Sequence, residues 1–233
     1  MPTPTTPSSP VDAAPADAPR PRLVARLLSR TRRGHLEQAI AAGRLREVER
    51  FDLLAVEGLR ALARKSLWLL VAGGVAFAGL NLAVRAVRHS GPLLGESSPA
   101  ARALVLVLAN VAAYIVMVPV HEALHAAVIV ALGGRPRFGL KLPLAAYCTA
   151  PGQLFTRDGY TAVALAPLVV ISAAGVVLTW LSPAAAAYLL FGLAGNISGA
   201  VGDLDTVARL RHRPNTTLVA DTETGYIAYE PML

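Results

Sequence analysis

The sequence has a single cysteine, Cys148, among 233 residues, and aromatic side chains make up only 6% of it. One cysteine excludes an intrachain disulfide framework and a zinc site built from several thiolates, so we expect Cys148 to be a buried thiol. Even so, 54% of the residues are hydrophobic and the mean hydropathy is +0.50. That value is high for a soluble domain, and because aromatics are scarce the apolar character comes from helix-compatible Ala, Leu and Val.

Charge is absent from long parts of the chain. Residues 67–84 and 103–120 are uncharged, and so is everything from Gly159 to Gly202, where Ser182-Pro183 divides the stretch in two. About 18 apolar residues are enough for a helix to cross a hydrocarbon core of about 30 Å. We therefore predict an all-α membrane protein with four transmembrane helices, near residues 67–87, 103–132, 160–181 and 184–202.

The basic residues are distributed unevenly around these spans. Of the 22 Lys and Arg residues, 12 precede residue 67, four lie between 133 and 159, and three follow residue 203. Only Arg85, Arg88 and Arg102 flank the loop 85–102. The positive-inside rule then predicts a multi-pass protein of the cell membrane with both termini in the cytoplasm. Because the charges follow the membrane, the net charge of +7 does not indicate nucleic-acid binding.

Three domains follow from this pattern. Residues 1–21 are rich in Pro, Ser, Thr and Ala and are predicted to be a disordered tail. Residues 22–65 combine many arginines with apolar residues three or four apart, which favours one or two basic amphipathic helices on the cytoplasmic membrane face. A solvated arginine-rich linker is the alternative. Residues 67–230 form the four-span domain.

Two segments of that domain are predicted to contain strands. Residues 141–156 are apolar but contain Pro143, Pro151 and Gly152, which exclude a spanning helix and favour a short cytoplasmic-side β-hairpin dipping towards the membrane. The C-terminal residues 216–230 resemble a β-strand pair around a Thr-Glu-Thr-Gly turn.

The second predicted span contains the sequence HEALH, from His121 to His125. On a helix the two histidines are about 40° apart around the axis, so both imidazoles can reach one Zn²⁺. Glu122 is then placed to take a proton from a zinc-activated water. Chance, or histidines that only hydrogen-bond inside a helix bundle, is the alternative. Ionisable residues within a span are costly, however, which favours a functional site.

A catalytic zinc site needs a third protein ligand, and Asp203 is the first charge after the long uncharged stretch. His121 lies about 27 Å along its helix from residue 103, and Asp203 about 28 Å along its helix from residue 184. Both should therefore lie at the same depth. Asp205 is the rival ligand, Asp158 and Glu223 are weaker candidates, and Asp203 as a helix cap or interfacial charge is the remaining alternative.

Asn196 shares the face of Asp203, seven residues earlier. It could orient a ligand or a substrate carbonyl, or it could form an ordinary interhelical hydrogen bond.

Together HEALH, LPLAAYC, ALAP, GNISGAVGD and the terminal strand pair resemble the putative zincin peptidase family over residues 67–230. This family comprises bacterial and archaeal membrane proteins distantly similar to site-2 proteases. The resemblance implies zinc-dependent proteolysis at or in the membrane, with His121, His125 and Asp203 as metal ligands and Glu122 as general base. It also implies that the loop 141–156 holds an extended substrate as an added strand.

The sequence therefore predicts a zinc metalloprotease whose partners are a membrane protein or peptide substrate and the lipid bilayer. Two other classes are compatible with the same residues. One is a non-catalytic metal-binding membrane scaffold, a pseudoprotease. The other is a metal or small-ion carrier, against which the lack of an inverted repeat argues.

Overall fold

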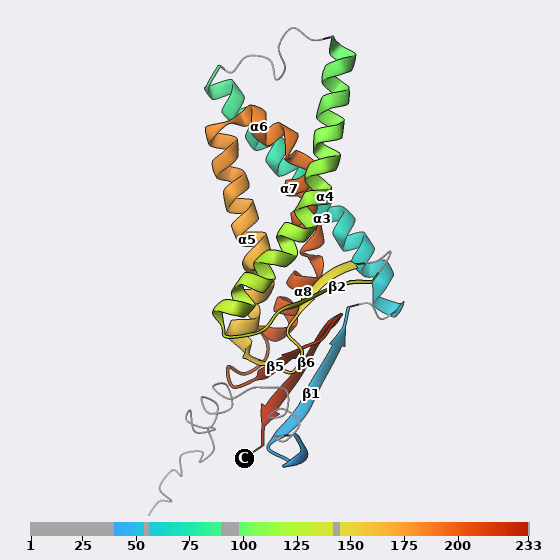
Figure 1. Ribbon diagram of the computed structural model, residues 1–233, viewed down its shortest axis with the longest axis vertical. Coiled ribbons are helices and arrows are strands. Elements are labelled where there is room, and N and C mark those ends of the chain that lie inside the picture. The colour runs from blue at the N-terminus through green and yellow to red at the C-terminus, as the bar shows by residue number, and fades with distance from the viewer. Residues whose placement is uncertain (1–39, 54–55, 90–97, 142–144, 233) are drawn as a thin grey trace, which may run out of the picture.

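The computed structural model describes residues 40–53, 56–89, 98–141 and 145–232. Three long helices, α3 (Val56–Val87), α4 (Pro99–Ala131) and α5 (Arg157–Leu181), run along the longest axis of the molecule, and the strands gather at one end of them (Figure 1). The predicted tail 1–21 and the first part of the predicted basic region lie outside the described residues.

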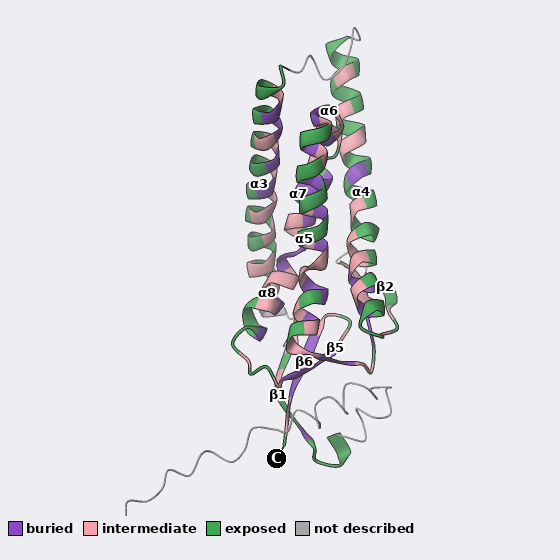
Figure 2. Cartoon of the chain, turned by 90° about the vertical axis from the view of Figure 1, so that its left-hand side faces the viewer, coloured by how far each residue is buried: buried purple, intermediate pink, exposed green. Residues whose placement is uncertain are grey.

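Within the described residues, three helices are long and apolar enough to cross a membrane: Leu59–Val87, Pro99–Ala131 and Arg157–Leu181. They coincide with the first three predicted spans. Figure 2 shows exposed residues along the length of all three helices, and many of these are large and apolar, such as Trp68, Leu108 and Val177. Exposed apolar side chains of this extent are typical of a surface that contacts lipid or another apolar partner.

The fourth predicted span, 184–202, is not one continuous helix. The chain forms α6 (Pro183–Tyr188), α7 (Leu190–Gly199) and α8 (Val201–Leu210) instead, with breaks at Leu189 and Ala200. Asn110 on α4 compensates the first break. Its Oδ1 accepts from the Phe191 N–H at 2.7 Å, and its Nδ2 donates to the Ala187 carbonyl at 3.1 Å. A helix can break in an apolar environment when protein groups satisfy the freed backbone in this way.

Helix α7 packs against α3, α4 and α5, and its residues Gly192 to Asn196 are buried. Glycines on α7 explain the close packing. A Cβ atom on Gly192 would lie 3.0 Å from the Ala113 carbonyl oxygen, and one on Gly195 would lie 2.6 Å from the Tyr114 ring. The backbone of α7 thus lies close to that of α4, which is where the predicted zinc site requires it.

The fold is not all-α, because β1 (Leu45–Asp52), β4 (Leu154–Thr156), β5 (Leu218–Asp221) and β6 (Gly225–Pro231) form an antiparallel sheet in the order β1-β6-β5-β4. The predicted C-terminal strand pair is confirmed as β5 and β6. The helix predicted for the region of β1 is wrong, because these residues pair with β6. The apolar residues of this strand are three apart, which imitates helical spacing, and a β-bulge between Glu47 and Glu49 shifts the register so that a strand accommodates them.

The predicted hairpin is confirmed as a two-stranded antiparallel sheet of β2 (Arg137–Lys141) and β3 (Ala145–Thr149). It begins earlier than the sequence indicated, and β3 packs against α4. Whether it lies against a membrane stays a prediction.

A hydrophobic core joins the sheet to the neighbouring helix ends. Its buried residues come from α4, α5, α8, the four-stranded sheet and the segment after β3: Ile129, Ala150, Phe155, Tyr160, Val163, Leu210, Val219, Tyr226 and Ala228. This core fixes the last turns of α4 against α5 and α8, and the predicted site residues lie on these elements.

Candidate metal centre

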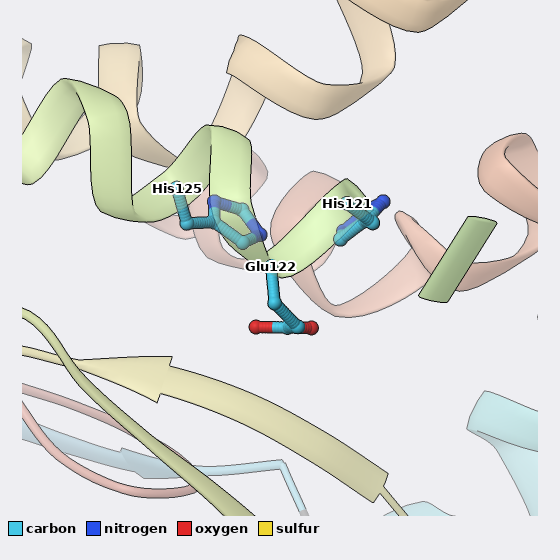
Figure 3. A group of neighbouring side chains, drawn as sticks. All are labelled: His121, Glu122 and His125. Atoms are coloured by element: carbon cyan, nitrogen blue, oxygen red, sulfur yellow. The ribbon is translucent and has the colours of Figure 1, made fainter. Parts of the chain in front are cut away.

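Helix α4 carries His121, Glu122 and His125 in its last three turns. One donor atom from each of the three side chains can be chosen so that all lie within 4.8 Å of one another. In Figure 3 the two imidazoles follow one another along the helix, and the Glu122 carboxylate points away from it towards the strands. The HEALH sequence therefore brings its three polar groups together, as the helical spacing predicts.

Asp203, in the first turn of α8, meets both histidines. Its Oδ2 lies 3.3 Å from His121 Nε2 and its Oδ1 lies 3.6 Å from His125 Nε2. The Asp203 side chain is only 19% exposed. The structure thus brings Asp203 next to both histidines, although the helix 184–202 assumed in the depth estimate is broken, and one carboxylate faces the Nε2 atoms of two rings.

The other candidate carboxylates lie elsewhere. Asp205 pairs with Lys65 on α3 at 2.7 Å, and Asp158 pairs with Arg157 at 2.7 Å with its side chain 73% exposed. Glu223, in the turn between β5 and β6, lines the same cavity as the histidines. Among these four carboxylates, the structure joins Asp203 to the histidine pair.

His125 is held from its Nδ1 side by a backbone carbonyl of α5. Its Nδ1 lies 2.8 Å from the Val163 oxygen. In a regular helix that oxygen accepts from the residue four positions later, which here is Pro167, and proline has no N–H. The freed carbonyl accepts the His125 Nδ1 proton, so the Nε2 atom of the neutral ring keeps its lone pair and faces Asp203.

His121 is held in the same way by Asn196 of α7. Its Nδ1 lies 2.9 Å from Asn196 Oδ1, while Asn196 Nδ2 donates to the Pro167 carbonyl at 3.4 Å. Because Asn196 Nδ2 donates to the Pro167 carbonyl, Asn196 Oδ1 is the atom that faces His121 and accepts the proton on its Nδ1. Asn196 therefore forms an interhelical hydrogen bond, and this bond orients His121, a candidate ligand.

These side chains line a cavity of about 210 Å³. Its walls come from the end of β1, β3, α5, α8 and the turn between β5 and β6. Its acidic lining residues are Glu122, Asp203, Asp221 and Glu223, and among the described residues that line it there is no lysine or arginine. Carboxylates gathered in a partly buried cavity are costly to ionise unless they bind a cation or take up a proton.

The residues fit a zinc ion by the chemistry of their donor set. Two imidazoles with anchored Nδ1 atoms and one carboxylate supply three ligands, which is the number that catalytic zinc sites take from the protein, leaving a fourth position open.

Asp221, at the end of β5, is a cavity residue that the sequence did not single out. Its Oδ1 accepts from the Tyr160 hydroxyl and its Oδ2 accepts from the Ala150 N–H, both at 2.8 Å. Burial raises the pKa of Asp221 to about 6. In the sequence, Asp221 is recognisable only as a charged residue at the end of an apolar strand, just before a turn. Its partners Ala150 and Tyr160 are far away in sequence, so the sequence does not indicate that it lies in the cavity.

Cys148, on β3, also lines the cavity and is partly buried. Burial raises the pKa of its thiol to about 12, with the nearby Glu122 and Asp221 carboxylates contributing. The thiol is therefore neutral at physiological pH, and it is partly buried where the sequence predicts a buried thiol.

Residues 114–218 match the sequence model of the family described as "Putative zincin peptidase". The matched segment contains HEALH, Asn196 and Asp203, and the resemblance predicted from the sequence is confirmed for these residues. No curated protein and no solved structure matches the chain. The distant similarity to site-2 proteases stays a prediction.

Proposed function

We propose that the protein is a membrane-embedded zinc metalloprotease that hydrolyses a peptide bond near the cytoplasmic membrane face. One observation carries the proposal. Both histidines are fixed through Nδ1 and turn Nε2 towards Asp203, while Glu122 lies in the same cavity. The family match, over residues 114–218, supports the same class of chemistry.

His121 Nε2, His125 Nε2 and the Asp203 carboxylate would hold the zinc ion. When bound, zinc supplies a Lewis acid that polarises a carbonyl and makes an adjacent water easier to deprotonate. Glu122 accepts the proton of the attacking water and passes it to the leaving amine. Asn196 and the Val163 carbonyl keep the two imidazoles in the tautomer that this role requires.

The position of the site supports a substrate that comes from the membrane. A second cavity, of about 220 Å³, adjoins His121 and Glu122 from the side of the long helices and is lined by Tyr114, Met117, Gly195 and Gly199 among others. Further along the same helices lies an apolar cavity of about 720 Å³ between α3, α4 and α7. These cavities fit an apolar peptide or a membrane-protein segment better than a soluble polar substrate.

The test uses purified full-length protein in detergent or lipid, loaded with zinc, and a set of apolar peptides. Wild type should bind about one zinc per chain and cleave peptides, and Glu122→Gln should keep the zinc and lose the cleavage. Cleavage at wild-type level by Glu122→Gln would contradict the mechanism. Zinc binding without any cleavage by wild type would favour the non-catalytic metal-binding scaffold instead.

A further inference from the structure

The end of β1 forms part of the cavity, although it lies outside the family match. Phe51 and Leu53 line the cavity together with His121, Glu122 and Asp203. The Leu53 N–H donates to the Thr224 carbonyl at 2.7 Å, which holds the chain against the turn between β5 and β6. Because the matched segment begins at residue 114, the family resemblance does not account for this wall.

The Phe51 ring is held on the side away from the cavity. Its centroid lies 5.6 Å from that of Tyr226, and the Arg209 guanidinium carbon lies 4.2 Å from the ring centroid. Phe51 also packs against the buried core at the helix ends. An aromatic ring fixed in this way presents a firm apolar surface to whatever enters the cavity.

Leu53 packs beside Gly202, the residue that precedes the candidate ligand Asp203. A Cβ atom on Gly202, the residue before Asp203, would be only 2.7 Å from Leu53 Cδ2. Glycine at this position therefore lets the leucine side chain pack against the first turn of α8. Leu53 and Asp203 line the same cavity, so a group bound at Asp203 shares that cavity with an apolar side chain.

The distance between this wall and Asp203 is held by ion pairs. Glu49 Oε2 accepts from Arg213 Nε at 3.0 Å and from Arg213 Nη2 at 2.7 Å, and Arg209 Nη1 lies 3.6 Å from Glu49 Oε1. The Glu49 side chain is only 17% exposed. Arg209 is in the last turn of α8, so β1 is tied to the helix that carries Asp203.

We propose that Phe51 and Leu53 are specificity-determining residues that contact the substrate side chain next to the scissile bond and select an apolar one. Phe51 and Leu53 line the same cavity as the histidines and Asp203, so a peptide bound at that site would have a neighbouring side chain within reach of this wall, while the remaining acidic lining residues disfavour a negative one. The inference rests on the proposed peptidase function and deepens it.

The experiment compares Phe51→Ala and Leu53→Ala with Val48→Ala in the full-length, zinc-loaded protein. Val48 is the matched control, because it lies on the same strand and packs against the same core but does not line the cavity. Peptides that differ only in the residue beside the cleaved bond (Ala, Leu, Phe or Trp) are the substrates. Zinc content and melting temperature report folding.

Removing the Phe51 ring should raise kcat/KM for the Phe and Trp peptides relative to that for the Ala and Leu peptides by about tenfold or more, since hydrophobic pockets discriminate to that degree. Leu53→Ala should shift the ratio in the same direction, and Val48→Ala should keep the wild-type ratio. Phe51→Leu and Leu53→Phe change the wall with less risk to folding, and Leu53→Phe should disfavour Phe and Trp peptides. Unchanged ratios in zinc-loaded variants would overturn the proposal.

A binding measurement distinguishes failure of this specificity proposal from failure of the proposed peptidase function. Affinities for peptidyl hydroxamates bearing the same four side chains are measured with each variant. If wild type binds the hydroxamates but cleaves no peptide, the peptidase function fails and the affinity ratios alone decide the role of the wall. If wild type cleaves and the variants change neither the kcat/KM ratios nor the affinity ratios, the proposed role of Phe51 and Leu53 is wrong and the peptidase function stands.

Discussion

The Nδ1 atom of His125 lies 2.8 Å from the carbonyl oxygen of Val163, an oxygen that Pro167 leaves without a helical N–H partner. A proline in one helix thus prepares the acceptor that orients a histidine in another. The same proline offers its own carbonyl to Asn196, which orients His121. The two candidate zinc ligands on α4 therefore depend on one turn of α5.

Replacement of this proline should weaken zinc binding. In Pro167→Ala the new N–H can donate to the Val163 carbonyl and compete with His125, so we expect a loss of zinc affinity of about tenfold. Competition with a chromogenic chelator measures it. Pro183→Ala is the control, because Pro183 begins α6 and blocks no such bond. Equal affinities for wild type and Pro167→Ala would argue against the role of the freed carbonyl.

Asn196→Ala should lower zinc affinity about 10- to 100-fold, the range found when a residue that orients a metal ligand is lost. Asn110→Ala is the matched control, since Asn110 also links α4 to the α6–α7 region but lies far from the histidines along the helix. It should lower the melting temperature and leave zinc affinity near that of wild type. Equal zinc affinities in the two variants would show that Asn196 only supports packing.

The two neighbouring aspartates should behave differently. Asp203→Asn should reduce zinc affinity strongly, because it removes the carboxylate that faces both Nε2 atoms. Asp205→Asn removes only the ion pair with the half-exposed Lys65, and such pairs contribute about 0–1 kcal/mol to the stability of the fold. Its zinc affinity should therefore stay near that of wild type. Isothermal titration with zinc distinguishes the variants, and a larger loss for Asp205→Asn would reverse the assignment.

The buried Asp221 should make stability depend on pH. Burial raises its pKa from the ordinary 3.8 to about 6, so the folded state binds this proton more tightly than the unfolded state. Its contribution should therefore destabilise the fold increasingly as the pH rises from about 4 to about 6, and then stay constant. The melting temperature of wild type minus that of Asp221→Asn should fall over this interval. A constant difference, or one that rises, would contradict the raised pKa.

The sequence predicts the parts of this protein whose signals are local. Three candidate spans follow from uncharged apolar length, and the histidine pair follows from helical spacing. The contact of His121 with Asp203 agrees with the predicted depth, although the continuous helix 184–202 that the depth estimate assumed is broken at Leu189 and Ala200. The break at Leu189 could not be predicted, because it depends on Asn110 from another helix. The apolar residues of β1 are three apart in sequence, which favours a helix, and only the bulge within the strand reconciles this spacing with pairing to β6. The surroundings of Asp221 also require tertiary contacts.

Zinc-edge X-ray absorption of the purified, zinc-loaded protein tests the central claim most directly. Zinc held by His121, His125 and Asp203 should show nitrogen and oxygen neighbours at about 2.0–2.2 Å, with the imidazole scattering of two histidines. Asp203→Asn should alter this first shell, whereas Asp205→Asn should leave it unchanged. A sulfur neighbour at about 2.3 Å, which Cys148 would have to supply, or a wild-type spectrum retained in Asp203→Asn would contradict the account.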